Sequence, residues 1–199
     1  MDKIKSLTGM LDLYDDGDKT NLPAKLFYLE KKIRDIFLSY KLNEIRTPIL
    51  EDTNLFIRSV GGASDIVNKE IYSFNDRNDK GIALRPEGTA SVIRAIIEKK
   101  LDQTNHKLWY MGPMWRYERP QKGRYRQFNQ AGVEILGIPE GLPEFEMISI
   151  VCSIVNEFKL QNCTIKINHL GTQKNKESFC NALVKFLEPF KESLDEKDR

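Results

Sequence analysis

Residues 114–137, MWRYERPQKGRYRQFNQAGVEILG, gather charged and aromatic side chains in an unusual density. Five cations of this stretch enclose a single acid, Glu118: Arg116, Arg119, Lys122, Arg124 and Arg126. A guanidinium can neutralise a phosphate through two parallel hydrogen bonds. An aromatic ring such as that of Phe128 can stack on a base, and carboxylates or an amide can orient an amine and hydroxyl groups. This combination of groups predicts a nucleotide site.

The same stretch predicts an antiparallel hairpin of two strands, residues 107–118 and 127–137, joined by the basic loop 119–126. Because successive side chains of a strand point to opposite faces, Arg116 and Glu118 are expected on one face of the first strand. The second strand is expected to present one polar face that contains a glycine: Phe128, Gln130, Gly132 and Glu134. We expect Gly132 to leave an open floor there, where a ligand can approach the backbone.

Charged strand faces also occur without any ligand, as solvated surfaces with ion pairs between strands. Alternation alone does not separate this alternative from a binding site. The basic loop around Gly123 favours the binding site, because its cations repel one another unless an anion is present.

The elements expected to position the hairpin lie on both sides of it in the sequence. Hydrophobic periodicity predicts helices at about residues 23–41, 89–101 and 144–158, and a last helix with the apolar stripe Phe179, Leu183, Phe186 and Leu187. Strands are expected at residues 43–52, on either side of a turn within residues 70–88, and at residues 163–170 (CTIKINHL). Residues 1–20 predict a lead-in with little regular structure. The pattern indicates an α+β fold, a mostly antiparallel sheet flanked by helices.

The segment LRPEGTA contributes two further polar candidates. As residues i and i+2, Arg85 and Glu87 are expected to share a strand face. Thr89 is expected to begin a helix, where a hydroxyl can cap the helix or bind a ligand. Taken alone, this segment is typical of a turn followed by a helix N-cap.

Composition excludes several other classes of protein. The 199 residues suffice for one domain, and the net charge of +2 confines any polyanion site to a local patch. Three widely spaced cysteines predict reduced, partly buried thiols in a cytoplasmic protein rather than a zinc site or disulfides: Cys152, Cys163 and Cys180. His106 and His169 are isolated, which argues against a histidine metal site or a catalytic triad. No apolar run approaches the roughly 18 residues of a membrane span.

Taken together, these segments resemble the histidyl-tRNA synthetases, a family of class II aminoacyl-tRNA synthetases. Residues 107–137 resemble motif 2 of that class with high specificity, and residues 23–52, with Pro48, resemble motif 1. LRPEGTA resembles the amino-acid-binding strand and turn, and DIVNKEIYSF ahead of it also fits. The likeness runs to FLEPFKESLDE and implies the class II fold, a mostly antiparallel sheet with flanking helices.

The resemblance implies a role for individual residues. Arg116, the expected catalytic residue, binds the α-phosphate of ATP and the carboxylate of histidine. The implied histidine-binding residues are Glu87, Thr89, Arg116, Gln130 and Glu134. The first two hold the α-amino group of histidine. ATP binding falls to Arg116, Glu118, Arg124 and Phe128, with Phe128 stacked on adenine and Arg124 near the terminal phosphates. Contacts with tRNA fall to Arg119, Lys122 and Arg126.

The reaction implied is the ATP-dependent activation of histidine to histidyl-adenylate, followed by transfer to the 3′ end of tRNA(His). It needs no protein nucleophile, because positioning and charge stabilisation carry the catalysis. Magnesium is expected to be held mainly by the ATP phosphates rather than by a metal site of the protein, and Glu118 would help place the adenine or the ATP metal. The motif 1 segment implies a homodimer.

Some features depart from the family pattern. Thr8 stands where an arginine is usual, and Gly62 stands where an acid is common. Motif 3, the insertion domain and the anticodon-binding domain are absent, so residues 1–199 are expected to form a partial catalytic domain with impaired activity. The alternatives are a regulatory paralogue of histidine biosynthesis that does not charge tRNA, and a non-catalytic module for nucleic-acid binding or dimerisation. The intact basic loop argues against the paralogue, which has no need for it. An ATP-binding assay would distinguish the non-catalytic module from a synthetase.

Overall fold

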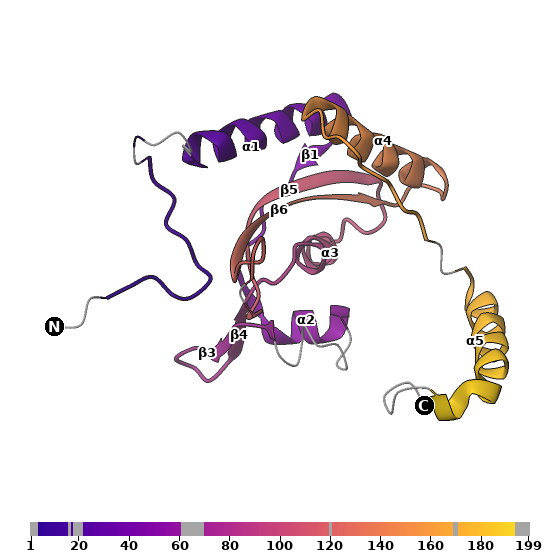
Figure 1. The fold of residues 1–199 in the computed structure, drawn as a ribbon. Helices are drawn as coiled ribbons and strands as arrows, with labels where there is room; N and C mark the ends of the chain where they lie inside the picture. The colour runs from indigo at the N-terminus through magenta and orange to yellow at the C-terminus, as the bar shows by residue number, and fades with distance from the viewer. Residues whose placement is uncertain are drawn as a thin grey trace. The chain divides into compact units, whose positions relative to one another are not determined.

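The computed structural model describes residues 4–15, 17, 22–60, 70–119, 121–168 and 171–193, which form two compact units, residues 1–160 and 161–199. The elements of the first unit are α1 (Leu22–Ser39), β1 (Asn43–Glu44), β2 (Leu50–Asp52), α2 (Thr53–Val60), β3 (Ser73–Asn75), β4 (Gly81–Leu84), α3 (Thr89–Glu98), β5 (His106–Trp115), β6 (Gln127–Leu136) and α4 (Leu142–Glu157) (Figure 1). The second unit contains α5 (Gln173–Leu187) and the short 3₁₀ helix η2 (Glu188–Ser193).

The hairpin of β5 and β6 is the longest paired segment of the described chain. Its antiparallel register runs over ten residues, from His106 opposite Leu136 to Trp115 opposite Gln127. β1 joins β5 in parallel, and β2, β4 and β3 form a second, antiparallel sheet. The predicted hairpin is confirmed, but β5 ends at Trp115, so Arg116 and Glu118 lie just beyond the strand.

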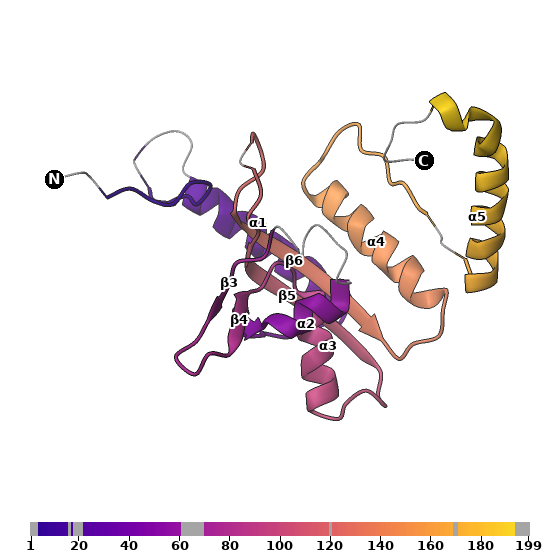
Figure 2. The same cartoon turned by 90° about the horizontal axis from the view of Figure 1, so that it is seen from below.

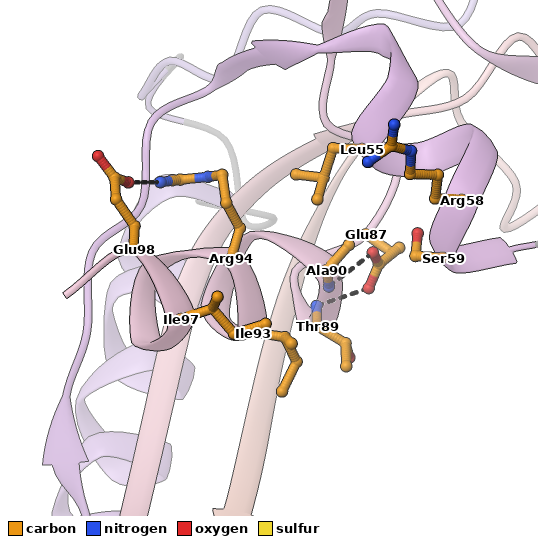
Figure 3. A pocket seen from close by; sticks show the side chains of 10 residues that line it. All are labelled: Leu55, Arg58, Ser59, Glu87, Thr89, Ala90, Ile93, Arg94, Ile97 and Glu98. Atoms are coloured by element: carbon orange, nitrogen blue, oxygen red, sulfur yellow. Dashed lines mark hydrogen bonds and ion pairs between the residues drawn. The ribbon is translucent and has the colours of Figure 1, made fainter. Parts of the chain in front are cut away.

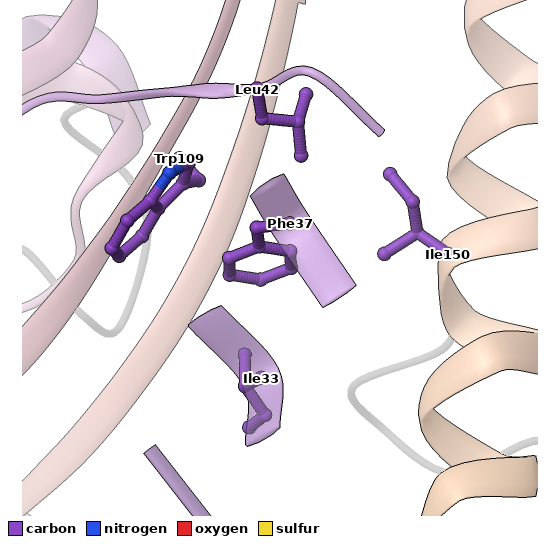
Figure 4. Close-up of a cluster of buried hydrophobic side chains, with 5 residues drawn as sticks. All are labelled: Ile33, Phe37, Leu42, Trp109 and Ile150. Atoms are coloured by element: carbon purple, nitrogen blue, oxygen red, sulfur yellow. The ribbon is translucent and has the colours of Figure 1, made fainter. Parts of the chain in front are cut away.

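Two apolar clusters hold the hairpin between helices. On one face, Phe37 of α1 packs on Trp109 with ring centroids 5.5 Å apart, beside Ile33, Leu42 and Ile150 of α4 (Figure 4). On the other face, α3 packs against the hairpin through Val92, Ile96, Leu108, Tyr110 and Met114. Figure 2 shows α2 and α3 in front of the hairpin and α1 behind it. The consecutive residues 108, 109 and 110 thus alternate between the two clusters, as strand geometry requires.

The strand predicted at residues 43–52 was wrong, because the chain crosses there from one sheet to the other. β1 and β2 belong to different sheets, with Pro48 between them. The Ile45 N–H still donates to the Trp109 carbonyl at 2.9 Å, whereas the Ile49 carbonyl accepts from the Arg85 N–H at 3.0 Å. Proline lacks an N–H for a ladder, which makes residue 48 a suitable point for the crossing.

The strand predicted at residues 163–170 is also wrong over its described part, since residues 163–168 have no regular structure. A strand needs a neighbour for its backbone groups, and no described strand pairs with this segment. The helix that follows it in sequence, α5, is confirmed. Gly62, His169 and residues 65–69 lie outside the described residues.

The apolar stripe predicted for residues 23–41 divides into a packed half and an exposed half. Ile33 and Phe37 are buried, whereas Leu22 and Leu29 near the start of α1 remain about half exposed. No helix among the described residues combines the length and apolar character needed to cross a membrane.

The two phenylalanines of α1 test which half of the helix stabilises the fold. Phe37 is 2% exposed and Phe27 is 70% exposed. Phe37→Ala should lower the free energy of unfolding by about 3–5 kcal/mol, because it leaves a cavity beside Trp109. At protein concentrations where the chain is monomeric, Phe27→Ala should change it by less than about 0.5 kcal/mol, because this side chain is mostly exposed within one chain. Urea denaturation followed by circular dichroism measures both, and equal losses in the two variants would contradict this packing.

Candidate functional site

Polar side chains gather between the hairpin and the first turn of α3. Thr89 is the first residue of α3, and its Oγ1 donates a 2.7 Å hydrogen bond to Oε1 of Glu134 on β6, 45 residues away in sequence. Gln130 shares the α3 side of β6 with Glu134. Glu87 lies two residues before the helix. Four of the five residues that the resemblance implied for histidine binding therefore gather here, whereas Arg116 lies in a second cluster.

Glu87 caps the N-terminus of α3. Its carboxylate accepts hydrogen bonds from the backbone N–H groups of Thr89, at 2.5 Å, and Ala90, at 2.9 Å (Figure 3). An anion at this end of a helix satisfies free N–H groups and interacts favourably with the helix dipole. The expectation that Glu87 and Arg85 share a strand face was wrong, because β4 ends at Leu84 and the chain turns before Glu87.

Arg85 is a buried structural arginine. Its Nε donates to the Pro113 carbonyl at 3.1 Å, and its Nη1 donates to the carbonyl and the hydroxyl of Thr47 at 3.0 and 3.2 Å. Burial lowers the pKa of the Arg85 guanidinium. Its hydrogen bonds tie β5 to the segment that crosses between the sheets.

Burial and a neighbouring negative charge shape the acidity of Glu134. Burial is the largest cause and raises the pKa of the Glu134 carboxyl. The Thr89 hydrogen bond acts against this rise, whereas the charge of Glu87 adds to it. Two nearby carboxylates, one of them partly desolvated, form a site suited to a cationic ligand group such as an ammonium.

The open floor predicted above Gly132 was wrong, because the ring of Tyr110 fills it. A Cβ atom on Gly132 would lie 2.2 Å from Cζ of Tyr110, and a Cβ atom on Gly88 would lie 2.2 Å from its Cε2. The ring, 5% exposed, therefore lies between two backbones that need glycine. Tyr110 was missed from the sequence, although two glycines near polar site residues were a signal that something large crosses both positions.

The expected ATP-binding residues form a second cluster at the loop end of the hairpin, where β5 ends and β6 begins. The Arg116 guanidinium lies over the Phe128 ring, 5.2 Å from its centroid, and its Nε donates to the Pro86 carbonyl at 2.9 Å. The Glu118 carboxylate pairs with Arg124 at 3.0 Å and lies 3.9 Å from Arg116. Two guanidinium groups share one carboxylate, so the cluster keeps a net positive charge suited to phosphates.

Three cations expected to contact tRNA differ in their surroundings. Arg119 and Lys122 are exposed in the loop. The Arg126 guanidinium instead lies 3.9 Å from the centroid of Tyr117, and its Nε donates to the Glu118 carbonyl. The Arg126 N–H also donates to the Gly9 carbonyl at 2.8 Å. The segment that carries the Thr8 departure therefore contacts the base of the loop.

A hollow of about 840 Å³ opens between α2 and α3, beside the polar cluster (Figure 3). Glu87 and Thr89 border it together with Leu55 and Ile93. Arg94 on its wall pairs with the buried Glu51 of β2 at 2.8 Å. Among the described residues, no three His, Cys, Asp or Glu side chains gather as a metal site.

Comparison with known proteins gives a consistent result. A family model described as histidyl-tRNA synthetase matches residues 24–190. A histidine–tRNA ligase of Latilactobacillus sakei is 47% identical over 175 residues, covering 86% of this chain and 40% of the relative. A chloroplastic histidine–tRNA ligase of Gracilaria tenuistipitata is 42% identical over 187 residues, covering 92% of this chain and 44% of the relative.

Solved structures show the same fold. The apo histidyl-tRNA synthetase of S. aureus superposes with a TM-score of 0.74 at 35% identity, covering 98% of this chain and 45% of that one. This chain therefore spans less than half the length of these relatives. Because the family model covers most of the chain and both ligases exceed 40% identity, the chain belongs to the histidyl-tRNA synthetase family.

Proposed function

We propose that this chain carries the ATP- and histidine-binding part of a histidine–tRNA ligase of class II. The position of Arg116 supports the proposal, because this side chain belongs to the second cluster and also contacts the backbone directly before Glu87. Its Nε donates to the carbonyl of Pro86, next to Glu87, while its guanidinium covers the Phe128 ring. A cation placed there can meet the carboxylate of an amino acid and the α-phosphate of ATP together.

In the proposed activation step, a carboxylate oxygen of histidine forms a bond with the α-phosphorus of ATP. The bond from that phosphorus to the oxygen bridging it to the β-phosphate breaks, and pyrophosphate leaves with the electron pair. Arg116 lowers the charge repulsion between the two anions and holds them in line. Glu87, Thr89 and Gln130 hold the α-amino group, while Glu134 accepts a hydrogen bond from the imidazole.

In the proposed second step, the 3′-terminal hydroxyl oxygen of tRNA(His) forms a bond with the carbonyl carbon of histidyl-adenylate and gives up its proton. The bond from that carbon to the phosphate oxygen breaks, and AMP leaves with the electron pair. The exposed charges of Arg119 and Lys122 support a role for the loop in holding the RNA backbone. They also disfavour a regulatory paralogue that binds no tRNA. Mg²⁺ arrives with the ATP phosphates, and the Glu118 carboxylate is a hard oxygen ligand that suits it.

The assembly and the compartment are also proposals. Residues 23–52 contain the exposed apolar side chains Phe27, Tyr28 and Leu38, and we propose that this segment forms a two-fold dimer interface. The prediction of partly buried thiols was wrong, because Cys152, Cys163 and Cys180 are all exposed. Their free thiols support a reducing compartment, which we take to be the cytoplasm.

Arg116→Lys tests the role of the guanidinium fork. The variant keeps the charge but loses the bidentate geometry, so the dissociation constant for ATP should rise at least about 30-fold, or roughly 2 kcal/mol. Isothermal titration measures the affinity, and histidine-dependent ATP–pyrophosphate exchange measures the reaction. Arg77→Lys, at an exposed position in the turn between β3 and β4, is the matched control. A change of less than threefold for Arg116→Lys would remove the basis of the proposal.

The salt dependence of tRNA binding tests the loop. For Arg119→Ala with Lys122→Ala, the slope of log K against log salt should become shallower by about 0.7–0.9 for each lost phosphate contact. Lys99→Ala with Lys100→Ala, beyond the end of α3, removes the same charge at a distance from the loop and serves as control. The assignment fails if the loop variant keeps the wild-type slope, or if both double variants lose slope equally.

Glu134→Gln tests whether the buried charge of Glu134 destabilises the fold, which shows in how the free energy of unfolding depends on pH. Because the folded-state pKa of Glu134 is raised, the folded chain binds its proton more tightly than the unfolded chain. The contribution of Glu134 to the free energy of unfolding is therefore greatest at low pH. It is lost as the pH rises from the pKa of Glu134 in the unfolded chain to its higher pKa in the folded chain. Glu134→Gln removes that loss, so its stability relative to wild type should increase over this range and then level off.

The measurement is urea denaturation of both proteins between pH 4 and pH 8, with histidine affinity at each pH. Gln retains an acceptor for the Thr89 hydroxyl but cannot carry charge, so histidine binding should weaken even where the fold becomes more stable. Glu140→Gln, at an exposed position, is the control. A stability difference that is independent of pH would show that Glu134 carries no such cost.

A further inference from the structure

The ring of Tyr110 is fixed by its packing, and its hydroxyl is the part available for hydrogen bonding. The ring lies between the backbones of Gly88 and Gly132, and a Cβ atom at either position would come within 2.2 Å of it. Because Gly88 directly precedes α3, the side chain of Tyr110 reaches from β5 to the start of α3. The hydroxyl therefore reaches the polar cluster on a side chain that cannot rotate away.

The hydroxyl of Tyr110 contacts the amide of Gln130. Nε2 of Gln130 donates to it at 3.3 Å, whereas the buried Oε1 of the same amide has no hydrogen-bond partner among the described residues. A buried carbonyl without a donor is unfavourable unless a ligand supplies one. The amide thus presents an unused acceptor inside the binding cluster.

The neighbours of the hydroxyl explain why the amide adopts this orientation. Burial is the largest cause and raises the pKa of Tyr110. The charges of Glu134 and Glu87 add to this rise, whereas a hydrogen bond with Thr89 acts against it. The Thr89 hydroxyl already donates its proton to Glu134, so toward Tyr110 it can act only as an acceptor. The Tyr110 hydroxyl can therefore direct its proton toward Thr89 and keep a lone pair for Nε2 of Gln130. The lone pair accepts from Nε2 and would repel Oε1, so the reversed amide is disfavoured.

We infer that Tyr110 is a positioning residue that holds Oε1 of Gln130 ready to accept an N–H group of the amino-acid substrate. This rests on the proposed function of the site. The consequence is selectivity, because a ligand without an N–H at this point leaves the buried carbonyl unpaired. Tyr110 acts through Gln130 and has no part in the binding of ATP.

Tyr110→Phe is the decisive variant, because it keeps the ring between the two glycines and removes only the hydroxyl oxygen. Histidine affinity should fall about tenfold, the size of one lost hydrogen bond, while ATP affinity stays within about twofold. Tyr40→Phe is the matched control, since Tyr40 loses a 2.8 Å hydrogen bond to Ser153 in the opposite apolar cluster. Its histidine affinity should equal that of wild type.

A second readout needs no ligand. The side-chain NH₂ signals of Gln130, identified by their absence in Gln130→Glu, should be distinct and slow to exchange in wild type and in Tyr40→Phe. In Tyr110→Phe they should broaden or merge as the amide becomes free to turn. Unchanged amide signals in Tyr110→Phe overturn the inference, and so does wild-type histidine affinity in that variant.

Different results would contradict the proposed function and the role of Tyr110. If the wild-type protein binds no histidine at millimolar concentration, the proposed function fails, and the amide signals alone then decide whether Tyr110 orients Gln130. If wild type binds histidine and both tyrosine variants lose affinity equally, the effect is one of general stability and Tyr110 is not a positioning residue.

Discussion

The ten-residue antiparallel ladder between β5 and β6 is the interaction on which the rest of the structure depends. Its alternation sends Trp109 toward α1 and α4 and sends Tyr110 toward α3, so that one hairpin forms a wall of both apolar clusters. A slip of one residue in this register would exchange the two faces. If β5 slipped against a fixed β6, the indole of Trp109 would replace the phenol of Tyr110 between the glycines, and Tyr110 would face α1. Register is therefore a condition for the site as well as for the core.

Two arginines near the hairpin have the same side-chain chemistry but different surroundings. Arg85 is 7% exposed and donates to backbone carbonyls, so it stabilises the crossing between the sheets. Arg116 lies past the end of β5, where one carbonyl and the face of Phe128 leave much of its fork free. The burial of a guanidinium and the number of its partners, rather than its charge, distinguish a structural arginine from one available to a ligand.

Local rules predicted much of this molecule. Apolar periodicity located α1, α3, α4 and α5 within a few residues, and the run of cations between two alternating segments predicted the hairpin and its loop. These predictions were accurate because helix and strand periods follow from backbone geometry. The strand expected at residues 163–170 failed because a strand forms only where a neighbour can pair with it. The strand at residues 43–52 failed because Pro48 made a crossing between two sheets possible.

The sequence by itself determined which residues share a face of β6, because alternation is a property of the local chain. It therefore placed Gln130 and Glu134 together, and the motif likeness added Glu87 and Thr89. Only the tertiary structure decided what occupies the space above Gly132, where Tyr110 of the neighbouring strand lies between that glycine and Gly88. A glycine in a sequence shows where a side chain is missing. What fills the gap depends on a strand pairing and a helix packing that bring together residues far apart in the chain.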